Sequence, residues 1–441
     1  MKNDFGFKKV VGTDSVYICI ADADTRAVMG AKTSRAPDLE KRWEELIAAN
    51  DGEMWEWGNP PEMVSKFLDT NLKGYMHASI AEMAEVFVHG RGMGWPSAWL
   101  IEDSPLFVGQ EVSSRAVDIL EADSALCDFS DPRLQGIHDQ WAALFAHLKD
   151  GAGKKGYKFD EIRWAIPGTA RSGVTMCNRV RDGVRQLEQI ESLGAPFDSL
   201  AQQMLKGFEA YAPRATAAVR RGSRRRSSLW GLTTEFTHSD DPSVTLPKRA
   251  VKIRSLGSVQ RREPARHVAR DTPNQYLDPS WNFYGPFEFE INCSVAAARD
   301  WHRHRSVMPW ELTVMLNEKE QLIKSPYYDM SALSKGLWAE TSEAFWAIFK
   351  DVGNPSWSAL HALPFGATVK LKCHAKLPDL LYTLELRYSS KGANAEYKDQ
   401  AKWGLYRLAT LLGPSITRRE KILGSLSKKD LAFWETHRAL L

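Results

Sequence analysis

The spacing of apolar and polar positions changes several times along the 441 residues, which indicates a mixture of helices and strands. Long stretches repeat apolar residues every three or four positions, the period of a helix with one buried face, whereas short stretches alternate like strands. We expect strands at 10–20, 287–291 and 368–373. We expect helices at 37–49, 61–72, 80–88, 110–122, 134–148, 174–190, 197–211, 295–304, 311–322, 333–350, 377–388, 399–412 and 428–440.

The order of elements in the second half broadly repeats the order in the first. Gln110–Ser113 aligns with Trp310–Thr313 at an offset of 200, and Ala165–Pro167 aligns with Ala362–Pro364 at an offset of 197. A nearly constant offset across two separated landmarks favours two related domains. We therefore predict an α+β fold in which each domain is a helix-rich layer with a small antiparallel sheet. The predicted domains are residues 1–213 and 272–441, joined by a basic linker at 214–271.

Length and composition place the chain among soluble globular proteins. A chain of 441 residues exceeds the size at which a single core stops growing, about 250–300 residues, so two domains are expected. At 43% hydrophobic and 26% charged, it contains no run of roughly 20 apolar residues and no apolar leader. Its five cysteines are scattered singly without a C-x-x-C pair, which fits a reducing cytoplasm better than a disulfide framework or a metal site.

Charge is nearly balanced overall, at +3 from 58 basic and 55 acidic residues, but it is concentrated locally. The segment 214–271 holds 14 Lys and Arg against five acidic residues, together with Gly, Ser and Pro typical of loops. A local basic surface of this kind is compatible with nucleic-acid binding through phosphates.

Two short runs carry residues suited to phosphate binding. Arg303, His304 and Arg305 form a dense cationic triplet, whose guanidinium groups could grip phosphate oxygens from two sides, although a solvated helix end is the alternative. A zinc site from His302 and His304 is disfavoured because residues two apart point away from each other on a helix. The second run places a carboxylate, two hydroxyls and a guanidinium together at Glu111, Ser113, Ser114 and Arg115, and we expect it at a helix N-terminus.

With these residues in view, the chain resembles the flavin-dependent thymidylate synthases, whose signature is an Arg-His-Arg triplet, a Glu and then a Ser-small-Arg turn. In the second half Arg303, His304 and Arg305 match the triplet and Glu311 matches the acid. The Ser-small-Arg positions fall there on Thr313, Val314 and Met315.

The first half keeps the Ser-small-Arg turn and lacks the triplet, the reverse of the second half. Glu111 and the turn Ser113-Ser114-Arg115 match the second part of the signature, while the triplet positions fall on Asp103, Ser104 and Pro105. Downstream of the signature, the family's further motif residues match Arg163, Pro167 and Asn178 in the first half and Pro364 and Arg387 in the second.

The resemblance implies a flavoprotein methyltransferase that converts dUMP to dTMP, using FAD, methylenetetrahydrofolate and NADPH. It implies that Arg303, His304, Arg305 and Asn178 bind the cofactor. It implies that Glu111, Ser113, Ser114, Arg115, Arg163 and Arg387 bind the nucleotide. Arg387 would also stabilise charge on the pyrimidine, an electrostatic role in catalysis. Glu311 would orient the arginines or bind a sugar hydroxyl, with a structural salt bridge as its alternative.

Because each half keeps what the other has lost, we expect one composite site with the triplet from the second half and the turn from the first. A homodimer would then rebuild a four-domain assembly. Two other functions stay open. One is a degenerate synthase fold that binds nucleic acid through 214–271, and the other is flavin-dependent one-carbon transfer to a different acceptor.

Overall fold

The computed structural model contains two compact units, each assembled from separate stretches of the chain. Unit 1 comprises Met1–Arg91, Leu106–Glu111 and Gly173–Ser227, and unit 2 comprises Gly92–Pro105, Val112–Ser172 and Ser228–Leu441. The structure describes residues 6–9, 17–20, 22–33, 39–52, 61–74, 78–115, 117–122, 127, 131–155, 159–194, 197–220, 233–238, 247–256, 281–282, 285–307, 309–328, 332–351, 357–390, 394–419 and 421–440.

Both units combine helices with small sheets, so the predicted α+β class is confirmed. The predicted boundaries near 213 and 272 follow sequence order, whereas the compact units interleave. The assignment of two related domains therefore stays a prediction. None of the described helices is long and apolar enough to cross a bilayer.

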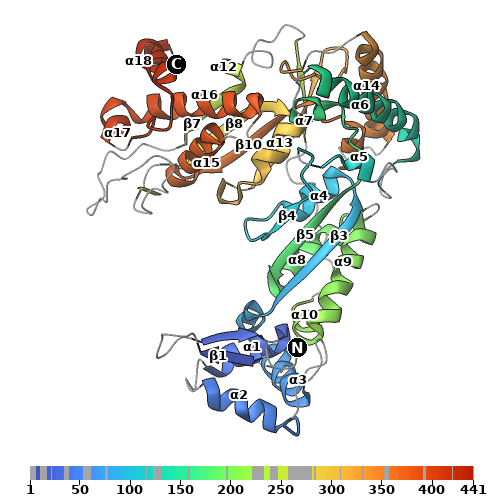
Figure 1. Ribbon diagram of the computed structural model, residues 1–441, viewed down its shortest axis with the longest axis vertical. Coiled ribbons are helices and arrows are strands. Elements are labelled where there is room, and N and C mark those ends of the chain that lie inside the picture. The colour runs from blue at the N-terminus through green and yellow to red at the C-terminus, as the bar shows by residue number, and fades with distance from the viewer. Residues whose placement is uncertain are drawn as a thin grey trace. The chain divides into compact units, whose positions relative to one another are not determined.

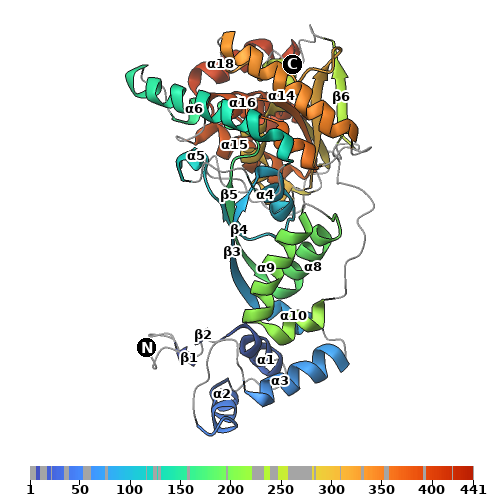
Figure 2. The same ribbon diagram turned by 90° about the vertical axis from the view of Figure 1, so that its right-hand side faces the viewer.

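Unit 1 is built around a three-stranded sheet with the strand order β3-β5-β4. Three helices, α8 to α10, pack on one another beside this sheet (Figures 1 and 2). Buried Val184 and Leu187 of α8 and Leu205 and Phe208 of α9 form the apolar layer. The elements of this unit are β1 (Gly6–Lys9), β2 (Tyr17–Ile20), α1 (Ala23–Thr33), α2 (Leu39–Ala48), α3 (Glu62–Leu68), β3 (Glu85–Met93), β4 (Gly109–Glu111), β5 (Ser172–Arg179), α8 (Val180–Glu191), α9 (Phe197–Tyr211) and α10 (Pro213–Val219).

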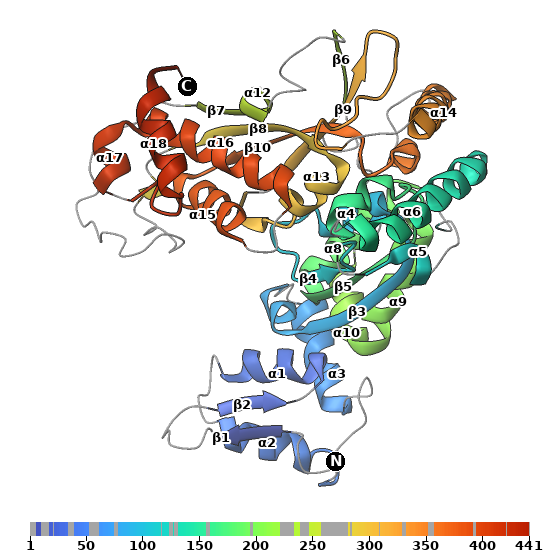
Figure 3. The same ribbon diagram turned by 45° about the horizontal axis from the view of Figure 1, so that its top comes forward.

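Unit 2 contains a five-stranded sheet with the order β6-β9-β10-β8-β7 (Figure 3). Its strands are antiparallel except for β6, which runs parallel to β9. The strands are β6 (Thr233–Thr237), β7 (Val251–Ser255), β8 (Phe287–Ser294), β9 (Trp310–Asn317) and β10 (Thr368–Ala375). The helices are α4 (Trp95–Glu102), α5 (Ile119–Ala122), α6 (Gln135–Lys155), α7 (Phe159–Ile162), α12 (Pro247–Ala250), α13 (Val295–His302), α14 (Ala332–Asp351), α15 (Leu377–Ser389), α16 (Ala395–Leu412), α17 (Pro414–Arg419) and α18 (Lys428–His437).

Strand β8 explains why this sheet has one apolar face. Phe287, Phe289 and Ile291 alternate with polar residues and are fully buried, as a half-buried strand requires. Helix α16 packs against β7 and β8, and its buried Tyr397 contacts Trp301 of α13 edge-on. The strand, the helix that follows it and α16 therefore share one core, which fixes α13 in place.

Four helix predictions are wrong in whole or in part. Residues 80–88 end a short 3₁₀ segment (Ala78–Met83) and begin β3, while 311–322 is mostly β9. Residues 110–122 hold β4, a turn and the short α5, and the start of 174–190 is β5. Short runs with β-branched residues fit both the helical period of 3.6 residues and the strand period of two residues over a few positions. In the folded chain alternate residues of these runs are buried, which is the pattern of a strand.

The basic segment 214–271 is not a simple linker. Its described parts form the end of α10, α12 and the two strands β6 and β7, which lie at opposite edges of the five-stranded sheet. Val251–Ser255 alternates apolar and polar residues, a pattern that the surrounding arginines and prolines obscured, whereas Thr233–Thr237 contains a single apolar residue and gives no alternation. Its most arginine-rich part, 221–232, lies outside the described residues, and so does 257–280.

The two sheets share an order of strands. In unit 1 the order is β3-β5-β4, and in the centre of the larger sheet the corresponding order is β8-β10-β9. A helix follows directly after the first strand in each case, α4 after β3 and α13 after β8. This recurrence supports the predicted duplication, which remains a prediction.

The two proline turns identified from the sequence lie against each other within unit 2. Phe365 N donates to Ile166 O at 3.0 Å, and Gly366 N donates to Trp164 O at 2.9 Å. Gly168 sits in this contact. A Cβ at this position would lie 2.4 Å from Leu363 O and 2.7 Å from His361 O, both backbone atoms.

We expect Gly168→Ala to destabilise the protein by about 1–3 kcal/mol, because the added methyl group meets backbone atoms that cannot move aside. The matched control is Gly336→Ala in α14, where nothing lies within 4 Å and the better helix former should stabilise by up to about 1 kcal/mol. Urea denaturation of both variants measures the difference. Equal midpoints for the two would contradict this account of the turn contact.

Candidate functional site

A buried aspartate lies at the centre of a group of arginines in unit 2. Asp300 is in α13, and its side chain is 4% exposed. Its Oδ2 lies 2.7 Å from Arg163 Nη2 and 4.0 Å from Arg115 Nη1. Its backbone oxygen accepts a hydrogen bond of 2.8 Å from Arg387 Nη2. Burial alone would raise the pKa of this carboxyl, but the nearby Arg163, Arg303 and Arg115 hold it at about 2.

Arg163 is fully enclosed by protein. Its side chain is 1% exposed and bridges two carboxylates, with Nε 2.8 Å from Asp160 Oδ1 and Nη2 on Asp300. Burial acts to lower the pKa of Arg163, yet these two carboxylates raise it. A buried guanidinium held in this way is fixed in position.

The turn at Ser114 and Arg115 contacts α13 and α16. Ser114 is buried, and its Oγ accepts a hydrogen bond of 3.1 Å from Arg299 Nη1. Arg115 Nη1 donates to Tyr397 Oη at 2.6 Å. Arg387 of α15 lies over the same tyrosine ring, 5.2 Å from its centroid. The Ser-Arg turn of the first half and the distal arginine of the second therefore meet at one aromatic ring.

The cationic triplet follows directly after α13. Arg303 ends this helix, and Arg305 begins a 3₁₀ turn, where its Nη1 donates to His302 O at 3.1 Å. His304 lies between them and is 8% exposed. Its Nε2 is buried and has no hydrogen-bond partner among the residues that the structure describes. Burial and the positive charges of Arg387 and Arg305 lower the pKa of His304 well below its usual value, so its imidazole is neutral.

A second group of charges lies where α4 packs on α13. His302 stacks on Trp99, with ring centroids 3.7 Å apart and planes 22° apart. His302 Nε2 lies 3.4 Å from Asp103 Oδ1, and Arg305 Nη2 lies 3.5 Å from Glu102 Oε2. Burial would raise the pKa of Glu102, but His302 and Arg305 keep it below the usual value.

We call these residues together the arginine cluster. It contains six guanidinium groups and four carboxylates, so it carries an excess of two positive charges. Excess positive charge in a site of low exposure favours the binding of an anion. Its members are Arg115, Arg163, Arg299, Arg303, Arg305 and Arg387 with Glu102, Asp103, Asp160 and Asp300, and Ser114, His302, His304 and Tyr397 lie among them.

Not every residue predicted for the site belongs to this cluster. Glu311 is on β9, 55% exposed and 3.9 Å from Lys372, so it makes the salt bridge that was its alternative interpretation. Ser113 contributes its carbonyl to the turn, accepting from Val117 N at 2.9 Å.

Glu111 and Asn178 belong to unit 1. Glu111 ends β4 rather than opening a helix, so the expected helix N-terminus at this motif is wrong. Asn178 Oδ1 accepts a hydrogen bond of 2.9 Å from Val108 N, which ties β5 to the loop before β4. The ligand-binding roles of both residues stay predictions.

Sequence reasoning missed Asp300, Arg299 and Tyr397. No local sequence signal marks these three residues, since none of them lies in a recognised motif. The described residues include no group of three or more His, Cys, Asp or Glu arranged to hold a metal ion.

Comparisons with known proteins find similarity among solved structures. No protein-family model and no curated protein matches the chain. Among solved structures, the UMP/dUMP methylase PolB from Streptomyces cacaoi, bound with 5-Br dUMP, matches at 16% identity and a TM-score of 0.29. The match covers 46% of this chain and 93% of that one. At so low a TM-score, the match is not evidence for the structure of the present chain.

We expect Asp300→Asn to lower the free energy of unfolding by about 3 kcal/mol at pH 7, because it leaves buried Arg163 with one carboxylate instead of two. An unfolded aspartate titrates near 3.9, and the pKa of Asp300 is about 2. Its contribution is therefore complete above about pH 4 and is lost as the pH falls through about 2.

Chemical denaturation between pH 7 and pH 2 tests this expectation. Asp139→Asn is the control, since Asp139 lies on the exposed face of α6 and its loss should cost under about 0.5 kcal/mol. A deficit of Asp300→Asn that does not shrink toward pH 2 would show that Asp300 is not held as a carboxylate by the arginines.

Proposed function

We propose that the chain is a nucleotide methyltransferase that binds the phosphate of a uridine nucleotide in the arginine cluster and methylates C5 of its base. The observation that carries the proposal is the meeting of two half-motifs. The turn at Ser114 and Arg115 and the triplet at Arg303–Arg305 each match one part of the synthase signature, and both lie in unit 2 around Asp300. The residues that meet here do so within one chain, and the homodimer stays a prediction.

The chemistry of the cluster suits a phosphate. Arginine forks match phosphate oxygens in geometry and charge, and the Ser114 hydroxyl can donate a further hydrogen bond. Burial, together with Arg115 and Arg303, lowers the pKa of Arg387, which means that its positive charge is poorly compensated. An anion placed beside Arg115 and Arg387 would relieve this repulsion.

A flavin nucleotide also fits the residues that the resemblance assigns to it. FAD carries two phosphates, and the excess positive charge includes Arg303 and Arg305 of the triplet. The unpartnered Nε2 of His304 is a buried polar atom between these two arginines, where it could accept or donate one hydrogen bond. When bound, reduced FAD would supply hydride and carry the one-carbon unit, and the co-substrates we propose are methylenetetrahydrofolate and NADPH.

The protein's own contribution would be positioning and charge. Arg163, enclosed between Asp160 and Asp300, would hold Asp300 in place, and Asp300 in turn would position Arg115 and Arg387 beside the nucleotide. Arg387 would stabilise negative charge as it develops on a ring carbonyl, the role of an oxyanion-hole donor. Tyr397 would fix the positions of two arginines, because its hydroxyl accepts a hydrogen bond from Arg115 and its ring lies under Arg387.

Methyl transfer to a different acceptor remains a second possible activity of the same cluster. Nucleic-acid binding through 214–271 also stays a prediction, since the arginine-rich run 221–232 lies outside the described residues.

The absorbance spectrum of the purified protein, with and without dUMP, tests the proposal. We expect a flavin band that shifts on addition of dUMP, and a shift at least 100-fold less sensitive to deoxyuridine, because charge-assisted hydrogen bonds to phosphate contribute about 1.5–3 kcal/mol each. A colourless protein that does not take up FAD and does not bind dUMP would overturn the proposal.

Substitution of Arg387 tests the site itself. Arg387→Gln should weaken dUMP binding at least tenfold in calorimetry, since it removes a cation without shortening the side chain greatly. Arg254→Gln on β7, an exposed arginine paired with Glu288, is the matched control and should bind dUMP like the wild type. Equal loss in both variants would point to a general effect of charge rather than to this site.

A further inference from the structure

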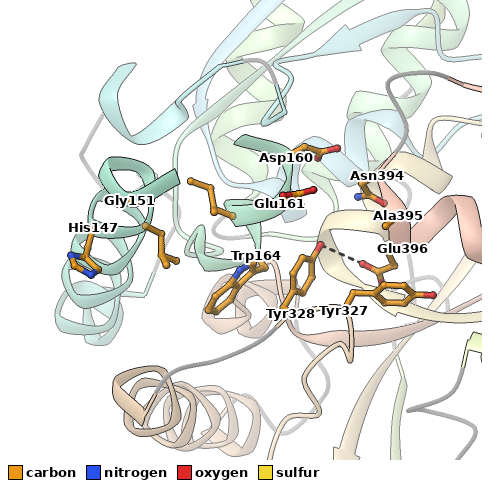
Figure 4. A pocket seen from close by; sticks show the side chains of 12 residues that line it. His147, Gly151, Asp160, Glu161, Trp164, Tyr327, Tyr328, Asn394, Ala395 and Glu396 are labelled. Atoms are coloured by element: carbon orange, nitrogen blue, oxygen red, sulfur yellow. Dashed lines mark hydrogen bonds between the residues drawn. The ribbon is translucent and has the colours of Figure 1, made fainter. Parts of the chain in front are cut away.

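Unit 2 contains a pocket of about 520 Å³ that lies between α6, α7 and the start of α16 (Figure 4). The carboxylates of Asp160, Glu161 and Glu396 line it and make it acidic. Because Asp160 also pairs with Arg163 of the arginine cluster, this pocket belongs to the site already described. A surface that shares no residue with the pocket or the cluster lies on the small sheet of unit 1.

The described helices of unit 1 cover only one face of its three-stranded sheet. Figure 2 shows α8, α9 and α10 on one side of β3, β4 and β5. Val88 of β3 points to that side, since a Cβ on Gly207 of α9 would lie 3.1 Å from Val88 Cγ2. Side chains alternate along a strand, so Phe87, His89 and Arg91 point to the other side. We call that side the open face, and its residues are Glu85, Phe87, His89, Arg91, Leu106, Val108, Gln110, Thr175, Cys177 and Arg179.

The open face exposes large apolar side chains. Phe87 is 71% exposed, and Val108, just before β4, is 60% exposed. Val108 lies beside Cys177 of β5, because Cys177 N donates to Val108 O at 2.7 Å. Exposed apolar side chains gathered on one surface are typical of a binding site. The ring of Phe87 is accessible enough to stack on a ring of a ligand.

A row of hydrogen-bonding side chains crosses the same face. His89 Nδ1 lies 2.9 Å from Thr175 Oγ1, and Thr175 is paired with Gln110 of β4 in the register of the sheet. The contact with Thr175 holds the imidazole ring of His89, and both His89 and Gln110 are exposed. These side chains can donate and accept hydrogen bonds, as the edges of unpaired nucleic-acid bases require.

The charge of the open face is positive. Arg91 and Arg179 are exposed, and neither forms an ion pair with another residue that the structure describes. Glu85, the acidic residue of the face, lies 3.8 Å from Arg26. Guanidinium groups without a carboxylate partner attract phosphates. A second copy of the chain would bring the same positive charges to this face, so charge complementarity favours a polyanion.

We propose that the open face binds single-stranded nucleic acid. Bases would stack on Phe87 and His89, and phosphates would pair with Arg91 and Arg179. Residues two apart on a strand are about 6.7 Å apart, so Phe87, His89 and Arg91 offer successive contacts to an extended strand. A duplex is disfavoured, because its bases stack on one another and offer no ring face to the sheet. None of these residues belongs to 214–271, and the inference does not depend on the proposed methyltransferase activity.

Fluorescence anisotropy of the full chain with a labelled oligonucleotide of about 12 nucleotides tests the proposal. Single-stranded RNA, single-stranded DNA and duplex DNA of one mixed sequence are the three probes. We expect at least one single strand to bind at least tenfold more tightly than the duplex. The comparison of RNA with DNA tells whether the site also contacts the 2′-hydroxyl.

Phe87→Leu removes the stacking ring and keeps an apolar side chain at an exposed position. The affinity for the single strand should fall at least fivefold, since stacking on an aromatic ring contributes to the binding of each base. Phe433→Leu on α18 is the matched control, because Phe433 is also an exposed aromatic residue but lies outside the open face. It should leave the affinity unchanged.

The double variant Arg91→Gln with Arg179→Gln tests the phosphate contacts. The slope of log affinity against log salt concentration should become shallower by about 1.4, since each phosphate contact to a single strand contributes about 0.7. Lys428→Gln with Lys429→Gln on α18 removes the same charge from exposed positions outside the open face. This control should keep the slope of the wild type.

Four results would overturn the proposal. The first is that neither single strand binds at about 0.1 mM protein. The second is that the duplex binds as tightly as the single strands. The third is that the variants of the open face and of α18, all folded by circular dichroism, bind equally, which would place the nucleic acid elsewhere on the chain. The fourth is a dimer in sedimentation that Phe87→Leu dissociates and an oligonucleotide does not, which would assign the open face to a second copy.

Discussion

The ion pair between Asp300 and Arg163 is the constraint on which unit 2 depends. Two opposite charges taken almost fully out of water are tolerated only when each is paired and hydrogen-bonded, and here Asp160 completes the pairing on the other side of the guanidinium. The same Oδ2 of Asp300 also lies 4.0 Å from Arg115 Nη1, and the backbone oxygen of Asp300 accepts a hydrogen bond from Arg387. One helical turn of α13 therefore fixes three arginines that come from distant parts of the sequence.

The pairing leaves positive charge in excess. The arginine cluster contains more cations than carboxylates, and burial, followed by the neighbouring arginines, lowers the pKa values of Arg387 and His304. A protein that needed only stability would gain from replacing such groups with apolar ones. We interpret their presence as the requirement of an anionic ligand, and the acidic pocket beside α7 provides the opposite environment within the same unit.

The sequence predicted several long helices well and several strands poorly. Helices α9, α13, α14 and α15 were placed within one or two residues at nearly every end, because long runs of a 3.6-residue period have no strand alternative. Strands β3 and β9 were taken for helices because short β-branched runs satisfy both periods. Only contacts between distant segments decide such cases.

The same limit applies to the site. Ser114, Arg115, Arg163, Arg387 and the triplet could be singled out because their residue types match a pattern. Asp300 could not be, since an aspartate in the middle of an alanine-rich helix carries no local signal of its role. Tyr397 gains its importance from packing alone.

The strands β6 and β7 have a further consequence for the basic segment from which they come. Each adds to one edge of the three central strands, so the polypeptide that leaves the first half crosses from one border of the sheet to the other. These two strands are therefore the outer strands of the sheet, and outer strands invite pairing with other chains unless charged side chains oppose it. Lys252 and Arg254 on β7 are charges of this kind, so the basic residues of the connection also protect one border of the sheet against aggregation.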